Sequence, residues 1–392
     1  ANPAGAGTFW LGNGDAIKTD PLRISQAGYG MNAFINELRD HNATLSGNYV
    51  LTNRGGEGDT NRNIIFLSHN PAGVGNGTGP GVPGGPYDGQ AQPLEKRAIF
   101  DGTLTLNGTA TPFTGSTASS EVTIGVEHQL WSLRNSGDWI TVGAYSTFEN
   151  KGLIHLNKGN NLVGILIDVE AWNNNDGPAH KTINNGTIKI TAGDTTNDPT
   201  GGNSIGIDYG EYINQTFKSE LTVGNIIVAG SKNYGLRMAN IFTGNNAYFD
   251  KGTTIKSGGV GKKILVQGKK NVGVSIAKFL STAANANPIA NISDLNVTLA
   301  GEESIGFLRN KNYSSNNTND MVFDSTTMGI FELGKGAKNS TLIRTDKYGI
   351  QVRKDISSTG KDDDGKDNTG TGNTVLHANG KDQHIYNYNT IT

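Results

Sequence analysis

The chain has 392 residues, of which 55 are glycine and none is cysteine, and its formal net charge is −2. The lack of cysteine excludes disulfides and thiolate metal ligands, and the nearly balanced charge gives no general attraction for nucleic acid or an anionic membrane. Glycine is about twice as frequent as in an average protein, which indicates a folded chain that is rich in turns. No run of 18 apolar residues is present, so this chain is not expected to insert into a membrane.

Residues 1–60 are predicted to form an N-terminal cap. Asp20 and Pro21 are typical of the start of a helix, and the apolar residues that follow have helical spacing. The pattern predicts one helix over about 21–40. Such a cap would cover the first open edge and the apolar interior of the structure that follows.

Residues 61–392 contain short strand-like runs that are separated by Gly and Asn turns. In Thr187–Ile190 the two isoleucines are predicted to face the interior and Lys189 the solvent, and Ile154 and Leu156 flank His155 in the same way. Strand-like runs at 153–156, 187–190, 226–228, 264–266 and 297–299 each precede a pair of glycines five residues apart. The pairs are Gly159 and Gly164, Gly201 and Gly206, Gly230 and Gly235, Gly268 and Gly273, and Gly301 and Gly306, with Gly349 as a degenerate sixth copy.

We call this pattern, a strand-like run followed by two glycines five residues apart, the repeated phrase. Its copies recur at variable intervals, whereas helical repeat families have nearly constant periods. Short strands with one corner that absorbs insertions instead predict an all-β fold, a right-handed parallel β-helix, over residues 61–392. The glycines are expected at coil corners, where φ is positive or coils approach closely, and Asn is the next-best residue there. Insertions are expected at about 71–97, 171–180, 192–202, 281–290, 309–320 and 358–373.

The pairing of Asn-Asn-Gly-Thr-Ile at 184–188 with Asn-Ser-Ile-Gly-Ile at 203–207, and its echoes, resembles the passenger domains of large monomeric autotransporter adhesins, particularly the fusobacterial kind. The likeness is strong over 143–352 and looser before it. It implies export, a cleaved signal peptide before Ala1, and display on the bacterial cell surface. The outer-membrane tether would be a C-terminal barrel that this chain does not contain.

The resemblance implies a monomeric adhesin fragment that attaches to a receptor glycan or protein on host cells or other bacteria. No cofactor and no enzymatic activity are expected. Two alternatives stay open: a polysaccharide-degrading β-helix enzyme, and an inert stalk that projects another domain. An enzyme of that kind needs neighbouring carboxylates. Asp208 and Glu211 follow Gly206, but the equivalent offsets after Gly164 and Gly235 carry no carboxylate.

Exposed aromatic side chains in insertions are the predicted binding residues, because they offer stacking faces for sugars and anchors for proteins. Trp172 and Tyr313 lie in insertions, and Asp176 is a polar partner near Trp172. Cover over the adjacent coil is the alternative role for Trp172.

Three other patterns resemble binding sites, and each is better explained without a ligand. The Gly268 to Gly273 spacing is that of a phosphate-binding loop, but the required Lys is missing after Gly273. The carboxylates at 362–367 lack a downstream Glu, which favours a solvated loop over a calcium site. The seven histidines show no metal-binding spacing, so no metal site is predicted.

Overall fold

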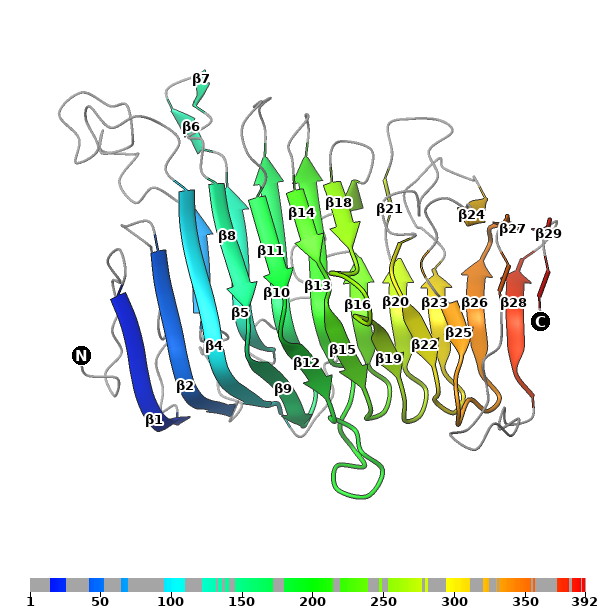
Figure 1. Cartoon of the computed structure of the whole chain (residues 1–392), viewed down its shortest axis with the longest axis horizontal. Coiled ribbons are helices and arrows are strands. Elements are labelled where there is room, and N and C mark those ends of the chain that lie inside the picture. The colour runs from blue at the N-terminus through cyan, green and yellow to red at the C-terminus, as the bar shows by residue number, and fades with distance from the viewer. Residues whose placement is uncertain are drawn as a thin grey trace.

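The chain is a parallel β-helix, as the sequence predicts, and the described part contains no helix. The computed structural model describes residues 15–25, 42–52, 65–69, 95–109, 122–131, 133–135, 138–140, 145–171, 180–213, 219–238, 247–248, 253–276, 279–280, 294–310, 320–323, 329, 331–353, 355–356, 372–380, 383–388 and 390–391. Its strands stack in chain order along the long axis of the molecule (Figure 1).

A 13-stranded sheet forms one wall of the β-helix. Its strands are β1 (Asp15–Ser25), β2 (Asn42–Thr52), β4 (Glu95–Asn107), β8 (Tyr145–Asn150), β9 (Leu153–Lys158), β11 (His180–Asn184), β12 (Thr187–Ile190), β14 (Ser219–Thr222), β15 (Asn225–Val228), β18 (Thr253–Lys256), β19 (Ile264–Val266), β22 (Val297–Leu299) and β25 (Phe331–Leu333). The long strand β4 pairs with both β8 and β9, so from β8 onward two short strands take the place of one long strand.

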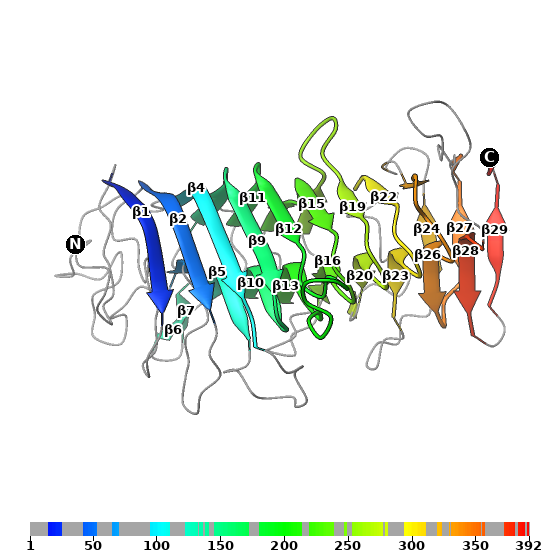
Figure 2. The ribbon, with the colours of Figure 1, turned by 90° about the horizontal axis from the view of Figure 1, so that it is seen from below.

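A nine-stranded sheet forms the opposite wall (Figure 2). Its strands are β3 (Ile65–His69), β5 (Thr123–Trp131), β10 (Leu162–Ala171), β13 (Ile205–Ile213), β16 (Tyr234–Met238), β20 (Val272–Ile276), β23 (Ile305–Arg309), β26 (Thr341–Asp346) and β28 (Thr374–Asn379). A third sheet near the C-terminus contains β24 (Met321–Phe323), β27 (Ile350–Val352) and β29 (Ile385–Asn387). Two further pairs are β6 (Leu133–Asn135) with β7 (Asp138–Ile140), which is antiparallel, and β17 (Ala247–Tyr248) with β21 (Phe279–Leu280).

One coil of the β-helix runs from β9 to β10 in the opposite wall and back to β11 and β12. Strand β12 then pairs in parallel with β9, and β13 pairs in parallel with β10. Backbone groups are therefore satisfied between coils, which is why each coil needs its neighbours.

The core is the bore between the two walls, and it follows the predicted alternation. Ile188 and Ile190 are fully buried while Lys189 between them is exposed, and Ile154 and Leu156 are fully buried on either side of His155. Because equivalent residues stack between coils, these side chains form continuous apolar columns.

The second glycine of each repeated phrase lies in a strand and not at a corner, which corrects the prediction. These five glycines stack as one column, and Gly125 on β5, which is not part of a repeated phrase, begins it: Gly125, Gly164, Gly206, Gly235, Gly273 and Gly306. A Cβ on any of them would lie 2.6–2.9 Å from the carbonyl oxygen of the residue one coil further on. The glycines are needed for close packing between coils, and Leu342 takes the next position in the column. Gly349 is therefore not a sixth copy of the phrase, and it lies between β26 and β27.

The corner that leads into the nine-stranded sheet has the left-handed backbone that the sequence predicts, one or two residues before each strand. Six non-glycine residues there have φ between 51° and 62°: Asn161, Asn203, Lys232, Lys270, Glu303 and Asn339. Asn is the expected substitute for Gly in this conformation, whereas Lys and Glu are not. Each of these six residues except Asn161 is followed by a residue whose side chain also fixes the corner. We call these following residues the corner ladder: Ser204, Asn233, Asn271, Ser304 and Ser340, with Asn373 as a sixth member one coil further on.

The corner ladder joins successive coils through side chains. The side-chain oxygen of each member accepts a hydrogen bond from the backbone N–H of the equivalent residue one coil earlier, at 2.8–3.3 Å. Its first five members are at most 1% exposed. An unmade hydrogen bond in such a buried position is costly, so the ladder fixes the corner.

The predicted helix over 21–40 is wrong where the structure describes it, because 21–25 belong to strand β1. Strand β1 pairs with β2 in parallel, and the register shifts between Thr19 and Leu22. That shift includes Pro21, which has no N–H to give to a strand ladder. Residues 26–41 lie outside the described residues.

The insertions leave the coils at two edges and not at one corner, which corrects a second expectation. The strands β10 and β23 of the nine-stranded sheet end at one edge, and the segments at 172–179 and 311–319 that come after them lie outside the described residues, as does 281–293 after β21. The predicted insertion at 192–202 lies at the opposite edge, between β12 and β13 at the corner-ladder side (Figure 1). The predicted insertions at 71–97 and 358–373 lie largely outside the described residues.

Candidate functional site

The three predicted binding residues, Trp172, Asp176 and Tyr313, lie outside the described residues. The strands next to them are described: β10 ends at Ala171 and β23 ends at Arg309. Both strands run in the same direction in one sheet, so both segments leave the β-helix at the same edge. With β13, β16 and β20 between them, four steps of about 4.8 Å separate the two strand ends by roughly 19 Å. The structure thus brings these segments to one edge but does not bring the two strand ends together.

The register around Asp208 matches the sequence prediction. Asp208 on β13 pairs with Leu166 on β10 and with Arg237 on β16, and Glu211 pairs with Val169. Asp208 is fully buried. The two strands next to β13 place Leu166 and Arg237 beside Asp208 and no carboxylate, while Glu127 occupies the same column two strands away, on β5.

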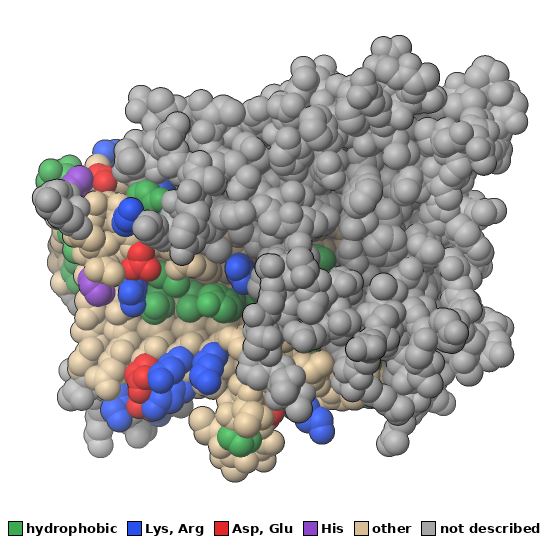
Figure 3. All heavy atoms as spheres, turned by 180° about the vertical axis from the view of Figure 1, so that it is seen from behind, with side chains coloured by type: hydrophobic (Ala, Val, Ile, Leu, Met, Phe, Trp, Pro, Cys, Tyr) green, Lys and Arg blue, Asp and Glu red, His purple; other side chains and the backbone are tan. Residues whose placement is uncertain are grey.

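A cluster of charged side chains covers the corner next to the ladder in the C-terminal half. Figure 3 shows Lys, Arg and acidic side chains gathered in a row over this corner. We call the cluster the charged corner: Lys269, Lys270, Glu302, Glu303 and Lys338. Backbone bridges Lys269–Glu302 and Glu302–Lys338 place these residues on three successive coils.

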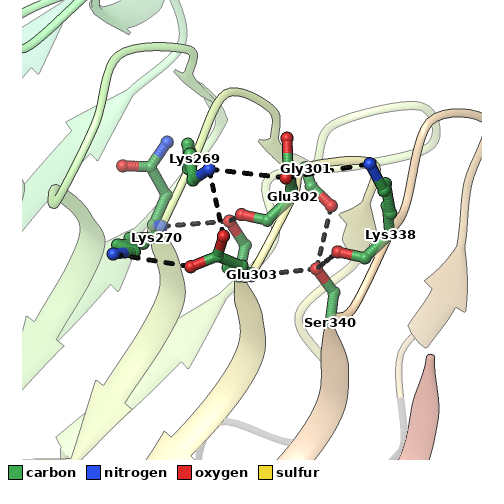
Figure 4. A network of polar contacts seen from close by, with 9 residues as sticks. Lys269, Lys270, Gly301, Glu302, Glu303, Lys338 and Ser340 are labelled. Carbon is green, nitrogen blue, oxygen red and sulfur yellow. Dashed lines mark hydrogen bonds and ion pairs between the residues drawn. The ribbon is translucent and has the colours of Figure 1, made fainter. Parts of the chain in front are cut away.

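Opposite charges alternate along the charged corner (Figure 4). Lys269 Nζ lies 3.0 Å from Glu303 Oε1 and 3.4 Å from Glu302 Oε1, and Lys270 Nζ lies 3.5 Å from Glu303 Oε2. The hydrogen bond to Glu303, together with Glu302, raises the pKa of Lys269, and the bond from Lys269 lowers the pKa of Glu303. Because each carboxylate already lies between ammonium groups, we interpret the charged corner as a solvated surface that removes repulsion between stacked coils.

A second cluster surrounds Asp320 on the third sheet. Asp320 Oδ2 accepts hydrogen bonds from His384 Nε2 at 2.6 Å and from Gln351 Nε2 at 2.9 Å. The His384 and Tyr386 ring centroids are 4.5 Å apart, and those of Tyr386 and Tyr388 are 6.2 Å apart.

Buried charge lies beneath this second cluster. Arg309 is 1% exposed, and its guanidinium carbon lies 3.3 Å from the centroid of the Tyr348 ring. Burial lowers the pKa of Arg309 to about 10, and Tyr348 and Asp320 offset part of that decrease. Arg309 therefore keeps its positive charge at neutral pH.

Sequence reasoning missed this second cluster. The only available signal was the alternation at Ile385 to Tyr388, which places two tyrosines on one face of a predicted strand. Asp320 and His384 are 64 residues apart. No fixed period relates them, so their contact could not be inferred.

Two general searches of the described residues gave no further site. They contain no group of three or more His, Cys, Asp or Glu side chains that could hold a metal ion, and no helix that is long and apolar enough to cross a membrane. The acidic stretch at 362–367 lies outside these residues.

Comparison with protein-family models, with known proteins and with solved structures found no match for this chain.

Proposed function

We propose that this chain is the binding part of a bacterial surface adhesin, displayed outside the cell, that attaches without covalent chemistry to a receptor on host cells or other bacteria. The receptor is a glycan or a protein. The chain needs no cofactor, and it acts as a single copy within a longer passenger.

One observation carries this proposal: each coil has a fixed corner and a variable edge. At the fixed corner the ladder hydrogen bonds set the path of the chain on successive coils. At the other edge the strands β10, β13, β16, β20 and β23 all end, although β10 and β13 run four residues further along the shared register, and segments of different length follow them. A rigid scaffold that presents variable segments from one edge is a common arrangement for recognition, because the scaffold positions side chains that contribute little to stability.

The experiment compares cell binding by the purified chain with binding by two variants at the predicted site. Removal of 172–179 and the substitution Trp172→Ala should each weaken attachment to host or partner bacterial cells. The loss should reach about thirtyfold, because an exposed aromatic anchor contributes roughly 2 kcal/mol. The β signal in circular dichroism should remain, since the paired strands β10 and β11 are untouched.

Val260→Ala is a matched control, because Val260 is a fully exposed apolar side chain in a different connection, between β18 and β19. It should bind as the unmodified chain does. Unchanged binding after removal of 172–179 rejects that segment as the site, and an unmodified chain that binds no cell overturns the proposal in favour of a stalk. Turnover of a glycan that Asp208→Asn abolishes would instead indicate an enzyme.

A further inference from the structure

The segment 385–391, which includes strand β29 of the third sheet, holds most of the exposed large apolar side chains of the described residues. Among the described residues, all large apolar side chains that are exposed lie at 385–391, apart from Val260. Two of them are Tyr386, at 48% exposure, and Tyr388, at 60%.

The direction of each side chain follows from the pairing. Ile385 pairs with Ile350, which is fully buried, so Ile385 continues the column that faces the core. Tyr386 pairs with Gln351 and therefore faces outward, as does Tyr388 two residues later. The exposure of the two tyrosines is a property of the outer surface, whereas that of Ile385 belongs to the inner column.

The outward face presents a row of rings. His384 and Tyr386 are neighbours, and the planes of Tyr386 and Tyr388 are inclined by only 32° at a centroid separation of 6.2 Å. We call these two adjacent, mutually tilted rings the platform. The guanidinium carbon of Arg353 lies 5.9 Å from the centroid of the Tyr388 ring.

Polar groups are held beside this platform. Asp320 orients both His384 and Gln351 through its carboxylate, and Gln351 Oε1 also accepts a hydrogen bond from Arg353 Nη2 at 3.4 Å. Gly349 lies between Asp320 and His384, and a Cβ there would lie 2.2 Å from Asp320 Oδ1 and 3.0 Å from His384 Nε2. The missing side chain at Gly349 thus leaves the room that the Asp320–His384 contact needs.

We propose that this face, formed by Gln351, Arg353, His384, Tyr386 and Tyr388, binds hexopyranose rings of a glycan. The apolar C–H face of a sugar stacks on Tyr386 and Tyr388, and the sugar hydroxyls exchange hydrogen bonds with Gln351 and Arg353. A sugar fits because it has an apolar face and a polar rim in one small ring, which matches flat aromatic rings bordered by fixed amide and guanidinium groups. Strand-borne rings also lose little conformational freedom on binding. The inference deepens the proposed function and rests on it only for the biological role.

The test measures sugar binding by the full chain. Saturation-transfer nuclear magnetic resonance with lactose, cellobiose, mannobiose and di-N-acetylchitobiose should show contact with at least one of them. Tyr386→Ala and Tyr388→Ala should each weaken that binding at least tenfold. Tyr234→Ala is the matched control, because Tyr234 also has an arginine, Arg237, near its ring at 5.7 Å but lies on β16 of the nine-stranded sheet. It should leave sugar binding unchanged, with the β signal in circular dichroism retained in all variants.

Three outcomes overturn this inference: none of the four sugars binds, the tyrosine variants bind as well as the control, or the variants change the particle mass in light scattering, which assigns the face to self-association. Competition on cells separates the inference from the proposed function. If the bound sugar does not inhibit cell attachment and Tyr386→Ala does not weaken it, the inference is overturned and the adhesin proposal stands. If the tyrosine variants abolish sugar binding but the unmodified chain attaches to no cell, the sugar site is supported and the adhesin role is rejected.

Discussion

Removal of one corner-ladder side chain tests whether inter-coil hydrogen bonds hold the β-helix together. Asn271 is fully buried, and its Oδ1 accepts from the Asn233 backbone N–H at 2.9 Å. Its Nδ2 donates to the carbonyl oxygens of Gly230 at 2.7 Å and Gln267 at 2.6 Å. Asn271→Ala therefore leaves two buried groups, the Asn233 N–H and the Gly230 carbonyl, without these bonds, whereas Gln267 is exposed and its carbonyl can bond to water. At about 1–3 kcal/mol for each unsatisfied buried group, with partial relaxation, we expect a loss of about 3 kcal/mol.

The ladder itself supplies the matched control. Asn271→Ser keeps an oxygen acceptor for the Asn233 N–H and one donor, as Ser304 and Ser340 do at equivalent positions. Because one donor bond is lost, this variant should lose only about 1–2 kcal/mol.

Local hydrogen exchange is the appropriate assay, since a solenoid need not unfold in one step. The Asn233 amide should exchange at least about a hundredfold faster in Asn271→Ala, because each 1.4 kcal/mol is a factor of ten. Urea unfolding followed by circular dichroism gives the global change. If the Ala and Ser variants exchange alike, the acceptor is not what matters, and if both match the unmodified chain, the ladder does not hold the coils.

Other predictions test packing, titration and shape. Gly273→Val should cost at least about 2 kcal/mol in urea unfolding, by overpacking, because its Cβ would lie 2.6 Å from Gly306 O and 2.8 Å from Val266 Cγ2; Lys189→Ala, on an exposed position, should stay within about 0.5 kcal/mol. Burial, together with the adjacent Lys189 charge, lowers the pKa of His155 below its ordinary value. The contribution of neutral His155 to the free energy of unfolding is therefore complete above about pH 6.5 and is lost as the pH falls. His155→Gln should flatten that dependence of unfolding free energy on pH. Small-angle scattering should give a radius of gyration clearly above roughly 21 Å, the value for a compact globule of this length; a value near 21 Å would refute the elongated shape.

The strands could be predicted from sequence because their signal is local. In Thr187–Ile190 the alternation of apolar and polar residues shows both the strand and its inward face, and the structure confirms both. The same kind of reasoning failed at Pro21, since Asp-Pro before apolar residues is compatible with the start of a helix and with a strand irregularity. Only pairing with β2 decides between them.

The role of asparagine could be predicted only in part. Asn161 and Asn203 do have left-handed backbone, as expected for corners. Asn233 and Asn271 instead use their side chains to join coils. An asparagine at the left-handed position and one at the next position along the chain have different roles, so a shift of one residue decides between them. The hydrogen-bond partner of the second kind lies on another coil, at a variable distance along the chain. For the same reason Asp320 and His384 could not be paired from sequence, whereas the common face of Tyr386 and Tyr388 could.

The single described insertion at the ladder corner shows why insertions there are restricted. An insertion between β12 and β13 must reconnect to the corner without losing the hydrogen bonds between coils. Asp198 accomplishes this, because its Oδ2 accepts from the backbone N–H groups of Gly159, on the preceding coil, and Gly193, within the insertion. The Gly202 N–H then returns to Gly159 O at 3.0 Å, which restores the path of the corner. An insertion at this edge therefore requires its own anchor, whereas the corner ladder places no such demand on the edge where β10, β13 and β23 end. Variation between coils is least constrained at that second edge, and this is the physical reason to look for receptor-binding residues there.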